Sequence, residues 1–501
     1  MIHLKNIQYQ YENCAANCLH DISLHIPKGQ CVLLTGSSGC GKTTLTRIIN
    51  GLIPSFYEGE LSGVAEISGR PIQDYRPEEL SRSVGSVFQN PRSQFFNLDS
   101  TSEIAFGCEN IGISRNEIKE RIERTAKELC IERLLNKNVF SMSNGEKQML
   151  AIASAYAMDP EIFVMDEPSA NLDAFASEQL GRIIARLKSL GKTIIIAEHR
   201  FHFLKGLPDR FIYLKSGRIE TEWTEPEFEK MSGAKRHELG LRSYDLKDIP
   251  LQTMPPQKVN YERQLTLHNI YSGYGKKSQI VKDVNCEAST GEIIGIIGKN
   301  GQGKTTLAKC LCGLIPETSG EIKINDLPMN YKKRIGKIYM VMQDPNYQLF
   351  SDSVEGEMSI ALQKKQAMSK DDKLKTLKLL SLDHYKDRHP LSLSGGEKQR
   401  LTIATSIAQN AKIVLLDEPT SGLDYRNMQR VRAVLDWLRQ QGRTVFVITH
   451  DFELLASTCD RILHIEAGTI RENYKLTDLS YQTLKNFFMD EVNKTKTIER
   501  D

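Results

Sequence analysis

Gly36-Ser37-Ser38-Gly39-Cys40-Gly41-Lys42-Thr43-Thr44 is the stretch that decides the fold of this chain. It follows the apolar run 31–34 and leads into residues 45–49, which predicts a buried strand, a tight turn and a helix. The pattern G-x-x-x-x-G-K-[ST] is a P-loop, whose glycines let backbone N–H groups surround phosphate oxygens at a helix N-terminus. Lys42 is predicted to reach the β- and γ-phosphates, and the Thr43 hydroxyl to hold Mg²⁺.

The same pattern occurs a second time after the apolar run 293–297, as Gly298-Lys299-Asn300-Gly301-Gln302-Gly303-Lys304-Thr305-Thr306. A glycine-rich turn with an incidental lysine is the alternative for either match alone. Two matches, each between a strand and a helix, favour two nucleotide-phosphate sites.

The composition restricts the class of protein. The 501 residues carry 66 Lys and Arg against 63 Asp and Glu, a net charge of +3, which gives no support for broad nucleic-acid binding by charge. No apolar run approaches the ~20 residues that span a bilayer, and the N-terminus lacks the apolar region of a signal peptide. The ten cysteines show no paired C-x-x-C spacing for zinc or an iron–sulfur cluster. We expect a cytosolic protein whose membrane role, if any, runs through a partner.

The second half of the chain repeats the first. One offset of 251 positions separates three pairs of equivalent residues: Ser143 and Ser394, Asp166 and Asp417, His199 and His450. The P-loop lysines are 262 positions apart, so the length differences lie upstream of the serines. A constant offset across three motifs indicates a duplicated domain.

Apolar strand runs alternate with helical stretches in each half, which predicts an α/β fold with a mainly parallel sheet. Residues 4–26 and 265–288 alternate between apolar and polar and predict antiparallel strands, whereas 110–135 is charged and helical. We predict a first domain over 1–235, a linker over 236–262, a second domain over 263–485 and a C-terminal tail over 486–501. The apolar cluster 487–489 in that tail is expected to pack, with a partner contact as the alternative.

Acidic pairs follow two of the apolar runs, Asp166-Glu167 and Asp417-Glu418. Both pairs would emerge at the C-terminal edge of a strand near the P-loop. Asp166 and Asp417 suit Mg²⁺ coordination, and Glu167 and Glu418 suit orienting or deprotonating the attacking water. A helix-capping acidic pair is the alternative.

His199 and His450 follow two further apolar runs, 194–197 and 445–448. A lone histidine is usually structural. Two at the offset of the carboxylates favour a contact with the γ-phosphate.

The segment Ser394-Gly395-Gly396-Glu397, followed by the run from Leu415 to Asp424, resembles the ATP-binding cassette (ABC) family over nearly the whole chain, twice. The resemblance implies two tandem P-loop NTPase domains, each a mainly parallel sheet with helices, an antiparallel β subdomain and a helical signature subdomain. It implies ATP and Mg²⁺ as cofactors. It also implies Q-loop residues that sense Mg²⁺ (Gln89 and Gln343), adenine-stacking aromatics (Tyr11 and Tyr274) and D-loops at 169–173 and 421–424 that include Asp173 and Asp424.

In that family two cassettes pair head-to-tail, and each ATP lies between one P-loop and the signature of the other half. The Lys42 site would then face Ser394-Gly395-Gly396, and the Lys304 site would face Ser143-Asn144-Gly145. The Asn144 side chain replaces the family's first glycine and can crowd the phosphate. We therefore predict intramolecular pairing of the two halves and slower hydrolysis at the Lys304 site.

The segments after the Q-loop glutamines share the pattern Q-[ND]-P-x-x-Q-[FL]-F, at 89–96 and 343–350. They resemble the ATPases of energy-coupling-factor transporters, which import vitamins and transition-metal ions. An exposed aromatic cluster there suits a groove for a helix of a membrane partner. A surface turn with a buried aromatic is the alternative.

The predicted function is a peripheral ATPase subunit on the cytoplasmic face of the membrane, coupled to integral membrane transport subunits, with no nucleic acid expected. A soluble twin-cassette ATPase acting on ribosomes or nucleic acid is the alternative. Such proteins usually carry a long charged linker, zinc cysteines or coiled-coil insertions, none of which the sequence shows. A non-hydrolysing regulatory sensor is disfavoured by Glu167 and Glu418.

Overall fold

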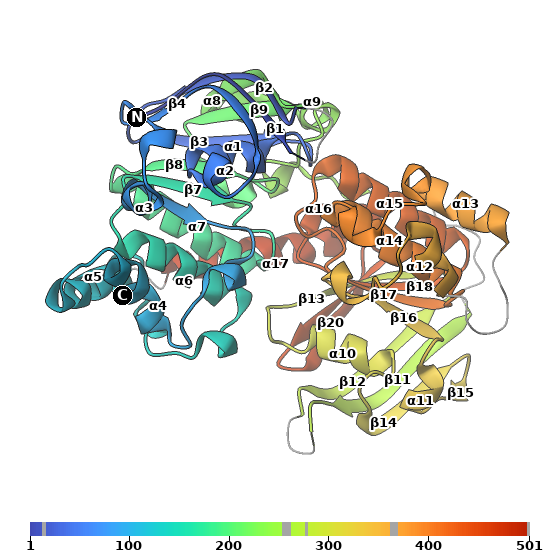
Figure 1. The fold of residues 1–501 in the computed structure, drawn as a ribbon. Helices are drawn as coiled ribbons and strands as arrows, with labels where there is room; N and C mark the ends of the chain where they lie inside the picture. The colour runs from blue at the N-terminus through green and yellow to red at the C-terminus, as the bar shows by residue number, and fades with distance from the viewer. Residues whose placement is uncertain (13–16, 253–261, 276–278, 361–368, 498–501) are drawn as a thin grey trace. The chain divides into compact units, whose positions relative to one another are not determined.

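The computed structural model describes residues 1–12, 17–252, 262–275, 279–360 and 369–497, with side chains up to Met489. The chain forms two compact units (Figure 1): the first comprises Met1–Asp248 and Asp424–Arg426, and the second comprises Ile249–Leu423 and Asn427–Asp501. Each contains one six-stranded and one four-stranded sheet.

The central sheet of the first unit has the strand order β6-β7-β8-β3-β9-β10. Its strands are β3 (Cys31–Gly36), β6 (Val84–Val87), β7 (Ile162–Asp166), β8 (Thr193–Ala197), β9 (Arg210–Lys215) and β10 (Arg218–Thr224). All neighbours are parallel except β9 and β10. Strands β3 and β8 are buried along their whole length, as expected for parallel strands covered on both faces.

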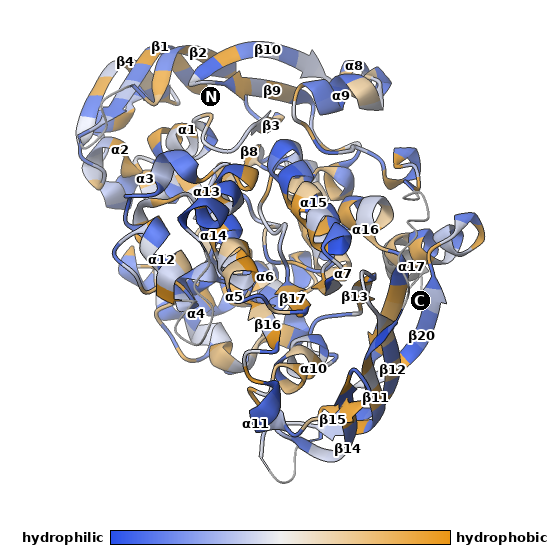
Figure 2. Ribbon diagram, turned by 90° about the vertical axis from the view of Figure 1, so that its right-hand side faces the viewer, coloured by the Kyte–Doolittle hydropathy of each residue, from blue (hydrophilic) through white to orange (hydrophobic). Residues whose placement is uncertain are grey.

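The smaller sheet of this unit is antiparallel, in the order β2-β1-β4-β5. Its strands are β1 (Ile2–Tyr11), β2 (Leu19–Ile26), β4 (Gly59–Ile67) and β5 (Arg70–Pro71). β1 and β2 alternate between buried and exposed residues, and the alternating colours are visible in Figure 2. Their apolar face forms one core with helix α1 and the central strands.

The helices of the first unit are α1 (Lys42–Ile49), α2 (Leu52–Ser55), α3 (Pro77–Ser83), α4 (Ser100–Asn110), α5 (Arg115–Glu128), α6 (Asn144–Ala157), α7 (Ala174–Ser189), α8 (Glu225–Lys230) and α9 (Gly233–Glu238). Helices α4, α6 and α7 contribute to a second core on the other face of the central sheet.

The second unit repeats this plan strand for strand, because its sheets have the orders β16-β17-β18-β13-β19-β20 and β12-β11-β14-β15. The central strands are β13 (Ile293–Ile297), β16 (Ile338–Val341), β17 (Ile413–Asp417), β18 (Thr444–Ile448), β19 (Arg461–Glu466) and β20 (Thr469–Lys475). The antiparallel strands are β11 (Arg263–Ser272), β12 (Val281–Ser289), β14 (Glu317–Ile324) and β15 (Leu327–Pro328). The duplication read from the offsets is therefore a duplication of topology.

The helices of the second unit are α10 (Lys304–Leu311), α11 (Tyr331–Arg334), α12 (Val354–Ile360), α13 (Lys370–Leu379), α14 (Gly395–Ala408), α15 (Tyr425–Gln440), α16 (Phe452–Thr458) and α17 (Asp478–Thr497). The aromatic cluster predicted to pack does so: Phe488 is buried against Phe452, and Phe487 lies against His464.

The first unit extends beyond residue 235. Residues 236–248, which we assigned to the linker, include the buried side chains of Arg236, Leu241 and Tyr244. Tyr244 packs edge-on against Phe228, and the Arg236 guanidinium lies over the same ring. An aromatic cluster therefore holds a segment whose sequence lacks apolar periodicity. Residues 253–261 of the predicted linker and 498–501 of the predicted tail lie outside the described residues.

The predicted fold class is confirmed in both units. In the described part of the chain, none of the helices combines the length and the apolar character that crossing a bilayer requires.

Candidate functional site: two P-loop centres

Both P-loops turn directly from a buried strand into a helix. The loop of the first unit joins β3 to α1, and Gly41 caps α1 with a φ of 104°. Gly303 caps α10 in the same way with a φ of 101°. A Cβ at Gly36 would stand 2.2 Å from the Leu214 carbonyl oxygen, so this close approach admits only glycine.

The P-loop lysines are buried and bound to their own loops. Lys42 Nζ donates to the carbonyls of Gly36 and Ser37, at 3.1 and 3.2 Å. Lys304 Nζ donates to the carbonyls of Gly298 and Lys299, at 2.6 and 2.9 Å. The ammonium groups are thus held over the loop, where they can meet the phosphates of a bound nucleotide.

A hydroxyl and a carboxylate meet at the base of each loop. Thr43 Oγ1 donates to Asp166 Oδ1 at 3.1 Å, and Thr305 Oγ1 donates to Asp417 Oδ2 at 2.8 Å. Burial, and then the charge of Glu167, raise the pKa of Asp166 to about 6; burial also raises the pKa of Asp417. Paired hard oxygen donors of this kind fit Mg²⁺, whose charge would favour the ionised carboxylates.

The predicted catalytic glutamates lie beside the predicted histidines. His199 Nε2 is 3.3 Å from Glu167 Oε1, and His450 Nε2 is 3.5 Å from Glu418 Oε1. Gln89 Nε2 also donates to Glu167 Oε2 at 2.7 Å. Burial acts to raise the pKa of Glu167, but the hydrogen bond and charge of His199, together with the charge of Lys42, outweigh it and lower the pKa below its ordinary value.

Both glutamates adopt a left-handed backbone conformation, with φ of 45° at Glu167 and 51° at Glu418. Their backbone N–H groups donate to the carbonyls of Ala197 and Ile448, each at 2.8 Å. This conformation is costly for a non-glycine residue. It occurs at both equivalent positions, so the two units share the turn that follows β7 and β17.

The Q-loop pattern has a local structural basis. The Gln94 side chain accepts from the Phe88 N–H at 3.0 Å and donates to the Ser86 carbonyl at 3.0 Å. Gln348 makes the same pair of bonds, from the Met342 N–H and to the Met340 carbonyl, both at 2.7 Å. The second glutamine of the pattern therefore fixes the turn that follows Gln89 or Gln343. The phenylalanines that end the pattern, Phe96 and Phe350, are 74% and 78% exposed, whereas Phe95 in the first segment is partly buried against the core.

The predicted adenine-stacking tyrosines lie in different surroundings. The Tyr11 ring packs edge-on against Tyr9, and its hydroxyl is 3.2 Å from Thr44 Oγ1. Tyr274 is half-exposed, and the Lys309 ammonium lies 5.7 Å from its ring centroid. Tyr274 offers the freer face, and adenine stacking remains a prediction for both.

The signature segments begin helices, as predicted. Ser143 caps α6 and Ser394 caps α14, each in a capping box with the glutamate three residues on. Gly145 and Gly396 lie in the first turns. Asp173 caps α7 by accepting from the Ala176 N–H at 2.7 Å, and Asp424 precedes α15.

Sequence reasoning missed Glu198 and Arg200, the neighbours of His199. Both contact Ser169 at the start of the first D-loop: Glu198 Oε2 accepts from the Ser169 N–H at 3.2 Å, and Arg200 Nη2 donates to the Ser169 carbonyl at 2.7 Å. The 251-residue offset carried the signal, because it aligns Glu198-His199-Arg200 with Thr449-His450-Asp451.

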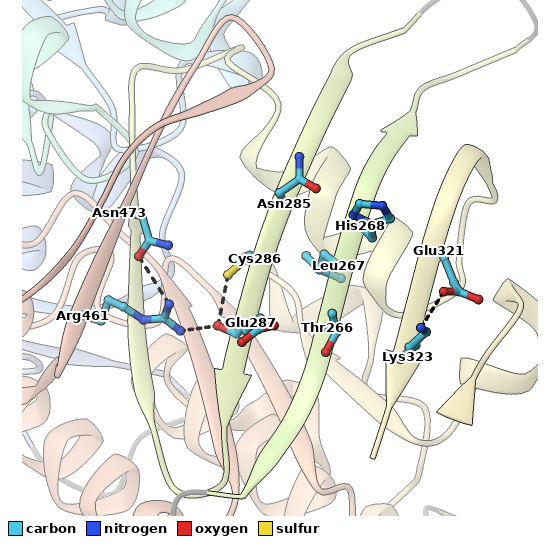
Figure 3. A pocket seen from close by; sticks show the side chains of 10 residues that line it. All are labelled: Thr266, Leu267, His268, Asn285, Cys286, Glu287, Glu321, Lys323, Arg461 and Asn473. Carbon is cyan, nitrogen blue, oxygen red and sulfur yellow. Dashed lines mark hydrogen bonds and ion pairs between the residues drawn. The ribbon is translucent and has the colours of Figure 1, made fainter. Parts of the chain in front are cut away.

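A separate pocket of about 550 Å³ lies on the four-stranded sheet of the second unit (Figure 3). Arg461 Nη2 donates to the Glu287 carbonyl at 2.6 Å, and Lys323 pairs with Glu321 at 2.9 Å, as the dashed lines show. None of the predicted site residues lines it. Its charged groups are engaged with the wall of the pocket, so we assign it no role in the P-loop chemistry.

Comparison with known proteins gives consistent matches. The sequence profile of the family described as "ABC transporter" matches residues 19–170 and 281–421. A Treponema denticola protein provisionally named an ABC transporter ATP-binding protein is 45% identical over 94% of this chain and 96% of its own length. A Bacillus subtilis protein provisionally named an HMP/thiamine import ATP-binding protein is 31% identical over 92% of this chain and 89% of its own length.

Among solved structures, the chain is similar to an archaeal ribosome recycling factor, aABCE1, crystallised with the ribosomal stalk protein aP1. The TM-score is 0.65 and the identity 22%, over 97% of this chain and 92% of that one. At this identity the likeness concerns the fold alone.

Proposed function

Because this chain belongs to the ABC transporter family, whose ATP-binding domain it contains twice, we propose that it is the ATPase subunit of an importer for a small solute, a vitamin or a transition-metal ion. The import would run through separate integral membrane subunits, with this chain on the cytoplasmic face. The named role of the Bacillus subtilis relative in HMP/thiamine import supports this class of cargo.

The observation that carries the proposal is the exposed apolar surface beside the first hydrolysis centre. Phe96 stacks on Phe106 with ring centroids 5.0 Å apart. Leu98 and Phe140 are also exposed, and the backbone of Leu98 accepts a hydrogen bond from Val139, the neighbour of Phe140. Phe96 follows Gln89 on the Q-loop, and Gln89 bonds the catalytic glutamate. An apolar patch linked in this way to the site of chemistry suits a docked helix of a membrane subunit.

The second unit presents an equivalent surface. Tyr347 and Phe350 follow Gln343 and are 70% and 78% exposed, and Leu391 is exposed just before the signature. Two equivalent patches match a transporter core with two docking helices. Each of the fused halves would then contact one membrane helix.

We further propose that two ATP molecules bind in composite sites between the P-loop of one half and the signature of the other. Mg²⁺ would be held by Thr43 with Asp166 and by Thr305 with Asp417, with Gln89 and Gln343 nearby; it would neutralise the charge that develops on the phosphates. Glu167 and Glu418 would take the proton from the attacking water, and His199 and His450 would contact the γ-phosphate.

Asn144 distinguishes the two composite sites. Among the described residues, no atom lies within 4 Å of a Cβ built at Gly395, so a side chain fits at this first signature position within its own unit. The Asn144 side chain accepts from Arg92 Nη2 at 3.5 Å and stays at the N-terminus of α6. Asn144 would crowd the phosphate that faces α6. Because this signature pairs with the Lys304 P-loop, the Lys304 site would hydrolyse ATP more slowly.

The first experiment is affinity purification of the chain from gently solubilised native membranes. Recovery of stoichiometric multi-span proteins supports the transport function, and Phe96→Asp and Phe350→Asp should each reduce that recovery. Phe56→Asp is the matched control, because Phe56 is 67% exposed but lies between α2 and β4. Recovery with ribosomes or nucleic acid instead, unaffected by these changes, would move the function to the soluble class.

The slow site is tested separately by ATPase assays. Glu167→Gln should remove most of the turnover, Glu418→Gln should remove less, and Asn144→Gly should speed the Lys304 site. If Glu167→Gln left turnover nearly intact while Glu418→Gln abolished it, the assignment of the slow site would be wrong.

A further inference from the structure

The two units surround their catalytic glutamates with different hydrogen-bond donors. In the second unit, Thr449 Oγ1 and the His450 backbone N–H both lie 3.3 Å from Glu418 Oε2 and donate to it. Asp451 is used elsewhere, since its Oδ2 accepts from Thr420 Oγ1 at 2.7 Å. The segment around His450 therefore holds Glu418 directly and binds Thr420, the residue before the 421–424 D-loop, through the Asp451 side chain.

In the first unit, the carboxylate of buried Glu198 binds the backbone amide that is equivalent to that of His450. Glu198 Oε1 accepts from the His199 backbone N–H at 2.8 Å and from the Arg200 N–H at 3.3 Å. The histidine backbone N–H therefore donates to the catalytic glutamate Glu418 in the second unit, but to Glu198 in the first. Glu167 keeps the His199 ring and the 2.7 Å hydrogen bond from Gln89.

Glu198 is also tied to the start of the D-loop. Its Oε2 accepts from the Ser169 N–H, and the Arg200 guanidinium donates to the Ser169 carbonyl. Within the described residues the Ser169 hydroxyl has no hydrogen-bond partner, although Thr420 at the equivalent position bonds Asp451. In the second unit, this position is bound through its side-chain hydroxyl. In the first unit, Glu198 and Arg200 bind the backbone N–H and carbonyl of Ser169 instead.

A carboxylate in this place is costly without such bonds. Glu198 is 2% exposed, and a buried carboxylate needs several donors to remain ionised. Burial, and then the charge of Glu167, raise its pKa, whereas Arg200 acts to lower it. A threonine, as in the second unit, would avoid this cost. Glu198 therefore calls for a role beyond packing.

We propose that Glu198 is a positioning residue for ATP hydrolysis in the first unit. By binding the His199 amide it leaves the Gln89 hydrogen bond to hold Glu167 Oε2, so hydrolysis by Glu167 depends on the Q-loop more strongly when Glu198 is present than when it is replaced. The inference rests on the ATPase activity of the family and not on import, so its failure would leave the proposed transport function unaffected.

The test is a double-mutant cycle between Gln89 and Glu198, in a background where Glu418→Gln silences the second centre. Single-turnover hydrolysis of MgATP and the KM are measured for Gln89→Ala, Glu198→Thr and the double variant. Gln89→Ala should slow hydrolysis at least about fivefold more when Glu198 is present than after Glu198→Thr, a coupling within the range for contacting residues. The KM should change by the same factor in both pairs.

A merely structural role would lower the melting temperature without this coupling. Glu198→Thr/Arg200→Asp is the second variant, because it transplants the pattern of the second unit and supplies an acceptor for the Ser169 hydroxyl. Loss of the Gln89 dependence in the folded variants supports the proposal. An equal effect of Gln89→Ala with and without Glu198, in either folded variant, overturns it.

Discussion

Glu317→Gln is expected to destabilise the second unit, because Glu317 neutralises an arginine that the fold buries completely. Arg334 is 0% exposed, and its Nη1 donates to Glu317 Oε1 at 3.1 Å. Its Nη2 donates to Glu317 Oε2 at 2.5 Å, and its remaining bonds go to the backbone carbonyls of Cys310, Leu311 and Met329. Removal of one member of a buried ion pair costs about 3–5 kcal/mol, because the remaining charge loses its partner.

That free energy corresponds to a large thermal shift. At ~2–4 °C per kcal/mol for a unit of this size, the melting temperature should fall by roughly 6–20 °C at pH 7. Differential scanning calorimetry of the full chain measures the shift. Hydrogen exchange of peptides from α10 to β16 assigns it to the second unit.

The pH dependence follows from the sign of the pKa shift. Burial acts to raise the pKa of Glu317, but the hydrogen bonds and charge of Arg334 lower it below its ordinary value of 4.5. The contribution of Glu317 is therefore complete above the unfolded pKa and is lost as the pH falls through the lower folded pKa. The difference in melting temperature between the wild type and Glu317→Gln should shrink below that value.

Two comparisons make the result decisive. Glu321→Gln removes an exposed pair with Lys323, which is expected to cost little. Glu317→Gln/Arg334→Leu should recover much of the lost stability, since the first unit places buried Leu80 at the corresponding position before β6. The reasoning is refuted if Glu317→Gln lowers the melting temperature no more than Glu321→Gln does.

Three further outcomes are expected. Gly298→Ala should remove the second of the two nucleotide sites and so halve the bound nucleotide measured by equilibrium dialysis, because its Cβ would stand 2.2 Å from a carbonyl oxygen at a φ of 143°; an unchanged stoichiometry would contradict this. Alkylation of Cys40 should be slow at pH 7 and rise with pH, because burial raises the pKa of its thiol, whereas exposed Cys130 should react readily; similar rates by mass spectrometry would count against it. Phe488→Ala should cost about 3–5 kcal/mol of unfolding free energy, since Phe488 is 2% exposed, and Leu479→Ala, at a 91% exposed position, should cost nearly none.

The sequence alone determined the features that depend on neighbours in the chain. A P-loop joins a strand to a helix through consecutive residues, so the local pattern suffices to place Lys42 and Lys304 at the start of a helix. The constant offset of 251 positions likewise predicted the repeated topology. It also paired Asp166 with Asp417 and His199 with His450, because both halves share one strand order. These inferences required only local spacing and apolar patterning.

Tertiary structure decided which of several local donors reaches a given carboxylate. Glu198 is one residue before a predicted site histidine, yet nothing in the sequence shows that it takes the His199 amide and binds Ser169. The left-handed turn at Glu167 and the burial of Arg334 against Glu317 arise in the same way, from elements distant in the chain. Hydrogen bonds between segments depend on ångström-scale placement, which hydrophobic periodicity does not encode.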